Sequence, residues 1–296
     1  MPATYQRIFR VRSTETDAYG HVNQVQYLRY MQEAAFEASA DVGYGQSRYR
    51  DLGTLWLIRE TEIEYFHSLY YGDRVEVTTW VGDFRRVRSR RFYEMRNPDT
   101  GDPVAKASTD WVYLDVATQR PVAIPQEMVA AFAPEGIEGM PPGERRDKFP
   151  EPPPAPPGAY TMRRTVEWRD VDSAEHVNNA VYLSYMEQSA IEQSASIGWP
   201  MQRMRADGFG VVARKHLIEY RLQATLGEAL LVTTFLSEPR RSSIIRNFLV
   251  ARPDGEIVAR SRSLYMCVSL ATGAPMRIPK QVLADFAPVI AGAESG

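Results

Sequence analysis

The sequence repeats one unusual segment, and this repetition most constrains what the chain can fold into. Residues 16–23 read TDAYGHVN and residues 171–178 read VDSAEHVN, so each copy has Asp, then His four residues later and Asn six residues later. Two long copies indicate a duplicated domain, since solenoids need at least three short repeats. An offset of 155 residues aligns the copies, and without a gap it also aligns Tyr27 with Tyr182, Glu37 with Glu192, Gly43 with Gly198, Tyr65 with Tyr220 and Gly72 with Gly227.

Each copy has the pattern of one strand, one long helix and then several strands. In the first copy, apolar residues recur every three or four positions from Val25 to Val42, the spacing of one buried helix face, and Gly43 follows where a glycine cap would stand. The second copy repeats this pattern less purely. This order predicts an α+β fold in which an antiparallel sheet wraps the helix. The expected strands lie at residues 5–12, 55–66, 73–81, 88–96, 105–115 and 161–168.

A proline-rich stretch separates the copies. Residues 151–158 read EPPPAPPG, a composition that favours extended polyproline geometry and cannot enter the interior of a sheet. The sequence therefore predicts domains at residues 1–134 and 161–296. Residues 135–160 are expected to form a linker long enough to let the two units pack against each other.

Composition excludes several classes of function. The 296 residues are 44% apolar with a net charge of -2, typical of a soluble globular protein, and give no electrostatic reason to expect a nucleic-acid or membrane partner. The N-terminus lacks the apolar core of a signal peptide, so we expect a cytoplasmic protein. Four histidines and one cysteine, Cys267, show no zinc spacing, so we expect neither a metal nor another cofactor, and we interpret Cys267 as structural.

The repeated segments carry a family resemblance. Asp17-x-x-Gly20-His21-Val22-Asn23-x-x-x-Tyr27, its counterpart from Asp172 to Tyr182, and the turns at residues 71–73 and 226–228 resemble the hotdog-fold thioesterases. The 4-hydroxybenzoyl-CoA thioesterase-like group and the acyl-ACP thioesterases are the most similar branches. The resemblance implies two tandem hotdog domains packed as an internal pseudo-dimer, a double hotdog. It also implies an enzyme of fatty acid metabolism that hydrolyses acyl thioesters of coenzyme A (CoA) or acyl carrier protein (ACP).

The same resemblance implies roles for the repeated residues. Asp17 and Asp172 would act as base or nucleophile, two routes that the sequence leaves open, since an aspartate is ordinarily ionised at neutral pH. A helix N-terminus offers N–H groups for a developing oxyanion, which makes the backbone N–H groups of Gln24 and Asn179 candidates. His21 and His176 could orient the aspartate or the substrate. Asn23 and Asn178 could bind the substrate or, like any Asp or Asn before a helix, only cap it.

Two departures from the acyl-ACP branch favour a simple mechanism of aspartate plus helix. That branch carries Asn two residues after the aspartate, where this chain has Tyr19 and Ala174, and an acidic residue on a later strand, where it has Ser68 and Gln223. The copies also differ from each other. Gly20, which would allow close backbone approach, is replaced by Glu175 in the second copy, so the sequence leaves open which copy works.

Four arginines after equivalent turns, Arg85, Arg86, Arg240 and Arg241, could bind the phosphates of coenzyme A or an acidic carrier protein, or could belong to a solvated strand face. Two other functions remain open. One is a hotdog hydratase or dehydratase, and the other is a non-catalytic module that binds acyl thioesters. Pairing of two chains into a homodimer of double hotdogs is also left open.

Overall fold

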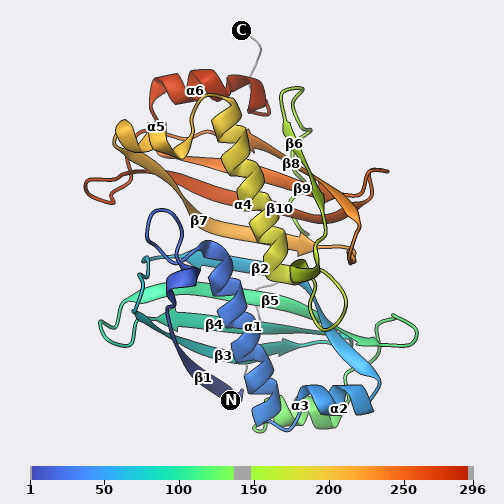
Figure 1. The fold of residues 1–296 in the computed structure, drawn as a ribbon. Coiled ribbons are helices and arrows are strands. Elements are labelled where there is room, and N and C mark those ends of the chain that lie inside the picture. Colours follow the sequence, from blue (N-terminus) through green and yellow to red (C-terminus); the bar gives the residue numbers. More distant parts are fainter. Residues whose placement is uncertain (1, 137–147, 293–296) are drawn as a thin grey trace. The chain divides into compact units, whose positions relative to one another are not determined.

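A computed structural model describes residues 2–136 and 148–292 (Figure 1). The chain divides into two compact units, Met1–Asp147 and Lys148–Gly296. Residues 137–147 of the expected linker lie outside the described residues. None of the described helices combines the length and the apolar content needed to cross a lipid bilayer.

The first unit is one antiparallel sheet with a long helix against it. Its strands lie in the order β1-β3-β4-β5-β2, and every neighbouring pair is antiparallel. The predicted plan of strand, helix and meander is therefore present. The elements are β1 (Thr4–Arg10), η1 (Ser13–Glu15), α1 (Gln24–Asp41), α2 (Gln46–Asp51), β2 (Thr54–Tyr65), β3 (Arg74–Phe84), β4 (Arg88–Arg96), β5 (Pro103–Asp115) and α3 (Gln126–Phe132).

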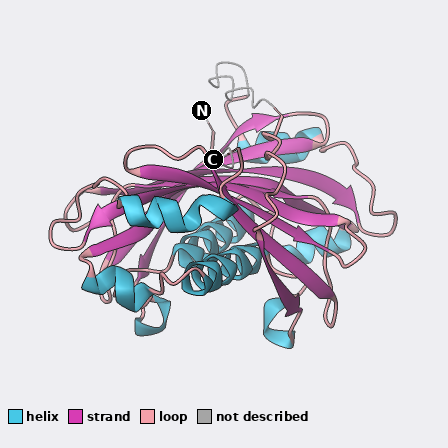
Figure 2. Ribbon diagram, turned by 90° about the horizontal axis from the view of Figure 1, so that it is seen from above, coloured by secondary structure: helices cyan, strands magenta, loops and turns pink. Residues whose placement is uncertain are grey.

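The second unit repeats this plan. Its strands lie in the order β7-β10-β9-β8-β6, again all antiparallel. In each unit the long helix lies against one face of its strands (Figure 2). The elements are β6 (Tyr160–Thr165), η2 (Trp168–Asp170), α4 (Asn179–Ser196), α5 (Met201–Ala206), β7 (Phe209–Tyr220), β8 (Ala229–Ser237), β9 (Ser243–Ala251), β10 (Ile257–Ser269), α6 (Lys280–Phe286) and η3 (Ala287–Val289).

Both long helices end as the sequence predicts. Gly43 adopts a φ of 86°, and its N–H donates to the carbonyl of Ala40 while the N–H of Tyr44 donates to Ser39. Gly198, with a φ of 87°, ends α4 through the equivalent pair of bonds. This pairing satisfies carbonyl groups that the last turn of a helix leaves open, and it favours glycine because φ is positive.

The less apolar face of α4 has a structural cause. Gln193 is buried there, its amide Nε2 donates to the carbonyl of Thr234 at 3.0 Å, and its Oε1 accepts from the buried guanidinium of Arg246. Burial lowers the pKa of Arg246 to about 10, which leaves it charged at neutral pH. A buried cation needs acceptors, so this helix face has to supply one.

The expected first strand of each copy is too long, because the chain leaves the sheet early. β1 ends at Arg10 and β6 at Thr165, and each is followed by a short 3-10 turn. In the first turn, Oε2 of Glu15 accepts from the hydroxyl of Tyr30 on α1 at 2.7 Å. In the second, Oδ2 of Asp170 accepts from Tyr185 on α4 at 2.6 Å. These contacts pull the chain toward the long helix just before each repeated segment.

Candidate active site

Each repeated segment forms the same tight loop in front of its long helix. The N–H of Asp17 donates to the carbonyl of His21 at 2.7 Å, and the N–H of Asp172 donates to His176 at 3.0 Å. The aspartate side chains accept hydrogen bonds from backbone N–H groups of the same loops. Oδ1 of Asp17 accepts from the N–H groups of Tyr19 and His21, and Oδ1 of Asp172 accepts from Ala174 at 2.9 Å. Each aspartate therefore shapes the loop that carries it.

The two asparagines cap the helices. Oδ1 of Asn23 accepts from the N–H of Val25 at 2.8 Å, and Oδ1 of Asn178 accepts from Ala180 at 3.0 Å. Helices α1 and α4 accordingly begin one residue later, as predicted. In the second copy, Nδ2 of Asn178 also donates to Oδ2 of Asp172 at 3.2 Å, which ties the aspartate to the start of α4.

Two tyrosines fix the first residue of each helix from the sheet. The hydroxyl of Tyr65, at the end of β2, donates to the carbonyl of Gln24 at 3.2 Å, and Tyr220, at the end of β7, donates to Asn179 at the same distance. The residues whose N–H groups are the candidate oxyanion donors, Gln24 and Asn179, are thus each fixed through their carbonyl groups. Sequence reasoning found these tyrosines only as a matching pair in the repeat and gave them no role.

The two histidines have different surroundings. The ring of His21 lies beside two aromatic rings, with centroid distances of 6.4 Å to Tyr19 and 5.2 Å to Tyr70. In the second copy the equivalent positions are Ala174 and Thr225. Nδ1 of His176 is buried and has no hydrogen-bond partner among the residues that the structure describes. A buried polar atom without a hydrogen-bond partner lowers the stability of the fold unless a ligand or a water molecule bonds to it.

A second atom of this kind lies on the adjoining loop. The N–H of Val177 donates to the carbonyl of Ala224 at 2.9 Å, which places Gln223 beside the second motif. Nε2 of Gln223 is buried and lacks a partner within residues 2–136 and 148–292. The hydroxyl of Tyr182 is a third buried polar atom without a hydrogen-bond partner among the described residues. Burial raises the pKa of this hydroxyl, and the nearby backbone of Ala224 acts in the opposite direction. Within the same ranges, no side chain of the first motif is left in this state.

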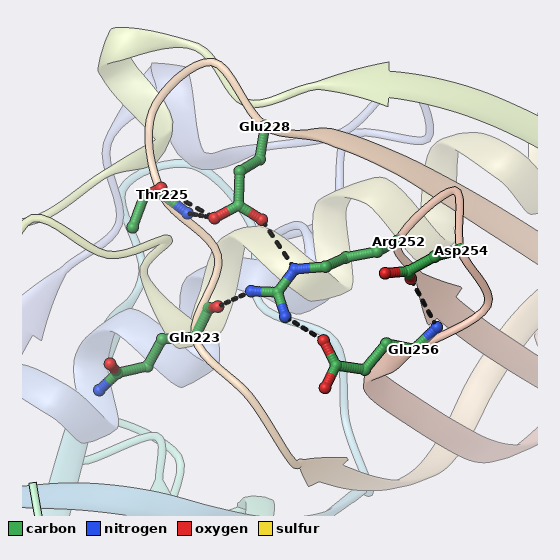
Figure 3. A network of polar contacts seen from close by, with 6 residues as sticks. All are labelled: Gln223, Thr225, Glu228, Arg252, Asp254 and Glu256. Atoms are coloured by element: carbon green, nitrogen blue, oxygen red, sulfur yellow. Dashed lines mark hydrogen bonds and ion pairs between the residues drawn. The ribbon is translucent and has the colours of Figure 1, made fainter.

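An ion-pair network holds the loop that carries Gln223 (Figure 3). Arg252 donates to the carbonyl of Gln223 at 2.9 Å and to Glu228 at 3.1 Å, and it also pairs with Glu256. Glu228 in turn accepts from the N–H and the hydroxyl of Thr225. Arg252 bonds the main chain of Gln223 and not its side chain, which points away from the network, as Figure 3 shows.

The Glu228 carboxylate is kept ionised by this network. Burial raises its pKa, but the hydrogen bonds from Thr225 and Arg252 outweigh burial and hold the pKa below its ordinary value. In the first copy Asp73 takes the place of Glu228 as an acceptor in the turn, and its Oδ2 accepts from the N–H of Tyr70 at 2.8 Å. Sequence reasoning used these turns only as a family feature.

The difference between Gly20 and Glu175 has another cause than the expected one. A Cβ built on Gly20 would meet no atom within 4 Å, so close backbone approach does not explain this glycine. Its φ is 84°, and Glu175 has a φ of 63° at the equivalent position. The loop requires a left-handed residue, and the second copy meets that requirement with a glutamate at some cost.

Replacing Glu175 by Gly is therefore expected to stabilise the chain by about 0.5–1 kcal/mol, since relief of the left-handed strain exceeds the entropy lost with glycine. Denaturant unfolding of Glu175→Gly beside the wild type measures this. Gly20→Ala is the matched control and should destabilise by a similar amount. A loss of stability in Glu175→Gly would contradict the strain argument.

The four predicted arginines lie elsewhere in their units. Arg85 and Arg86 are exposed on the turn after β3, and Arg240 and Arg241 are exposed on the turn after β8. The first motif adjoins the opposite end of β3, because the N–H of Val22 donates to Leu69 just before that strand. A strand of 11 residues spans roughly 35 Å, so the structure does not bring Arg85 and Arg86 to the motif of their own unit.

Comparisons with known proteins also find two repeated units in the chain. The model of the thioesterase-like superfamily matches residues 11–132 and 166–286. An acyl-[acyl-carrier-protein] hydrolase from chloroplasts of Cuphea viscosissima is 26% identical over 194 residues, covering 62% of this chain and 47% of that protein. A dodecanoyl-[acyl-carrier-protein] hydrolase of Cinnamomum camphora is 24% identical over 88% of this chain and 66% of its own length. The chain thus spans about half to two thirds of these curated relatives.

Solved structures show the same fold. The 12:0-ACP thioesterase from Umbellularia californica superposes with a TM-score of 0.72 at 21% identity, covering 89% of this chain and 94% of that one. An acyl-ACP thioesterase from Bacteroides thetaiotaomicron gives a TM-score of 0.69 at 18% identity, covering 88% and 97%. The predicted tandem hotdog fold is confirmed, and the chain belongs to the thioesterase-like superfamily, with one match in each half.

Proposed function

We propose that this chain hydrolyses fatty acyl thioesters carried by acyl carrier protein and that the second repeated segment is the working site. One observation carries the choice of segment. His176 Nδ1 and Gln223 Nε2 are buried without partners beside the capped start of α4, whereas no buried side-chain polar atom of the first motif lacks a partner among the described residues. Polar atoms left incomplete at the mouth of a helix N-terminus are what a substrate carbonyl and an attacking water would complete.

The start of α4 is proposed to hold the thioester oxygen. Hydrolysis builds negative charge on that oxygen, and the first-turn N–H groups and the helix dipole favour negative charge at this point. The backbone N–H of Asn179 is the proposed donor. Tyr220 supports it by fixing the carbonyl of Asn179, so the peptide does not have to reorganise during the reaction.

Asp172 is proposed to receive the proton of the attacking water. Its carboxylate is oriented by Ala174 N–H on one oxygen and by Asn178 Nδ2 on the other, an arrangement that suits a base more than a nucleophile. The hydroxide adds to the carbonyl carbon, the C–S bond breaks, and the proton passes to the departing thiolate. The products are a fatty acid and the free thiol of the carrier. His176 and Gln223 are proposed to orient the water and the carbonyl.

The first segment is proposed to have a structural task. Asp17 and Asn23 build the loop and cap α1, and His21 packs against Tyr19 and Tyr70. Arg85, Arg86, Arg240 and Arg241 remain proposed contacts of a carrier or of coenzyme A. Unchanged KM values in Arg85→Ala/Arg86→Ala and Arg240→Ala/Arg241→Ala double variants would remove them from that role.

The choice of carrier rests on the relatives, which are named as hydrolases of acyl carrier protein thioesters. The test is release of free thiol from a series of acyl-ACP and acyl-CoA substrates matched in acyl chain. We expect turnover with acyl-ACP at a higher kcat/KM than with the matched acyl-CoA. Absence of thiol release from the whole series would refute the enzyme, and tight binding without turnover would establish the binding module in its place. Hydration of an enoyl thioester would establish a hydratase.

A further inference from the structure

Three large apolar side chains are exposed around the second repeated segment. Trp168 is 79% exposed, Leu226 is 50% exposed and Leu222 is 37% exposed. Tryptophan is rarely left so open to water, and grouped exposed apolar residues on a soluble protein commonly mark an interaction site. We call Trp168, Leu222 and Leu226 the mouth patch.

Backbone hydrogen bonds bring the mouth patch together. The N–H of Gly227 donates to the carbonyl of Val166 at 3.0 Å, and Val166 donates to Glu228 at 2.9 Å, so the turn that carries Leu226 lies beside the start of η2. Trp168 is the first residue of η2, and Asp172 follows four residues later. Leu222 precedes Gln223 directly. The patch therefore borders the proposed catalytic site.

The fold itself does not require this patch. The first unit has the same 3-10 turn, loop and helix, yet Ser13 and His67 stand where the second unit has Trp168 and Leu222. The Leu226 position alone keeps an exposed apolar ring in the first unit, Tyr71, which is 68% exposed. Serine at the start of η1 supports the same local structure. The exposed tryptophan is thus a feature of the second site and not a necessity of the hotdog plan.

The exposed charge on the Trp168 side of the mouth patch is positive, since Asp170 is buried against Tyr185. On the Leu226 side, Glu228 is paired with Arg252. Glu167 is shared by two guanidinium groups, with Arg169 at 2.9 Å and Arg164 at 3.3 Å, which leaves one positive charge in excess. Arg163 on β6 and Arg169 are exposed to solvent. An apolar anchor with cationic neighbours fits a partner that has an acidic surface and a small apolar contact.

We propose that the mouth patch is the docking surface for an acidic carrier protein, which presents its thioester arm to Asp172. This inference rests on the proposed function. A carrier that delivers an acyl thioester to Asp172 has to contact the residues at the border of that site. Trp168 supplies the central contact, and the arginines steer the acidic partner toward it.

The test compares two carriers with the same acyl group. In Trp168→Ser, which installs the residue of the first copy, kcat/KM for acyl-ACP is expected to fall about tenfold through KM, the loss of one good interface contact. Its kcat at saturation, and its kcat/KM for acyl-CoA, should stay at the wild-type values. Ile191→Ser is the matched control, because Ile191 is 53% exposed but lies on α4 roughly 18 Å along the helix from Asn179.

Three results overturn the docking surface. An unchanged KM for acyl-ACP removes the patch from carrier recognition, and an equal loss with acyl-CoA assigns Trp168 to the arm or the acyl group. A wild-type dimer that Trp168→Ser converts into a monomer makes the patch an interface between two chains. If the wild type turns over neither substrate, the proposed function fails, and calorimetric titration of acyl-ACP into wild type and Trp168→Ser still decides whether the patch binds the carrier.

Discussion

Replacing Asp172 by Asn is expected to lower kcat for acyl-ACP hydrolysis by about 10²–10⁴-fold, the range that a positioned general base contributes. An amide is almost the same size as a carboxylate, and its oxygen can still accept from Ala174 N–H, so the loop should survive although the bond from Asn178 Nδ2 to the other carboxylate oxygen is lost. What the amide cannot do is take a proton from water. Steady-state release of free thiol by the purified variant measures the loss.

Two controls separate chemistry from folding in this experiment. Thermal unfolding of Asp172→Asn should stay within a few degrees of the wild type, since the variant removes no buried apolar contact. Asn178→Ala should instead lose about 1 kcal/mol of stability with its helix cap. Full activity in Asp172→Asn would show that another group is the base.

The second large effect is a loss of stability in acid that arises from His216. This histidine is fully buried, its Nδ1 lies 2.7 Å from the Ser263 hydroxyl oxygen, and burial lowers its pKa to about 3. The unfolded chain takes up a proton near pH 6.5, whereas the folded chain does not until about pH 3. Stability is therefore present above pH 6.5 and is lost as the pH falls, by about 2 kcal/mol between pH 7 and pH 5.

Denaturant unfolding at pH 7 and pH 5 measures this loss, and His216→Thr isolates it. Thr61 occupies the equivalent place in the first unit, so the fold tolerates threonine there. Other titrating groups act in both proteins, which means that the difference between wild type and variant belongs to His216. The variant should lose about 2 kcal/mol less than the wild type on acidification. Equal losses would mean that His216 is not buried as a neutral ring.

The sequence was sufficient for the fold because its signals are local. The offset of the copies aligns Gly43 with Gly198 and Asn23 with Asn178, and these residues fix the two ends of each long helix by contacts within a few positions. The ends of the first strands were wrong because they depend on a contact between Glu15 and Tyr30, fifteen residues apart. Such a contact can be recognised only once the helix has been placed against the turn.

The candidate site likewise combines residues that local spacing reveals with residues that only tertiary packing reveals. Asp172 and Asn178 could be singled out from spacing, and the structure gives both of them structural contacts as well. Gln223 entered the sequence interpretation only as a departure from a family pattern. Its buried amide becomes notable because Arg252, from the end of a distant hairpin, holds its main chain. Whether a polar atom finds a partner depends on tertiary packing, which no local pattern encodes.

The arginines after the equivalent turns illustrate a further limit. A cluster of cations at residues 85–91 indicates a place for an anion, but it does not say at which end of the sheet the cluster will lie. One of them, Arg91, is buried and bonds the hydroxyl of Thr79, so it is not available at the surface. The run of charges therefore mixes a residue of the interior with residues of the exposed turn.

The central claim is that acyl thioester hydrolysis belongs to the second repeated segment. The most direct measurement is kcat/KM on one acyl-ACP substrate for Asp17→Asn, Asp172→Asn and the double variant. The structure predicts that Asp17→Asn stays within about threefold of the wild type, while Asp172→Asn and the double variant share a loss of about 10²-fold or more. A loss in Asp17→Asn as large as that in Asp172→Asn, with stability unchanged, would contradict the claim.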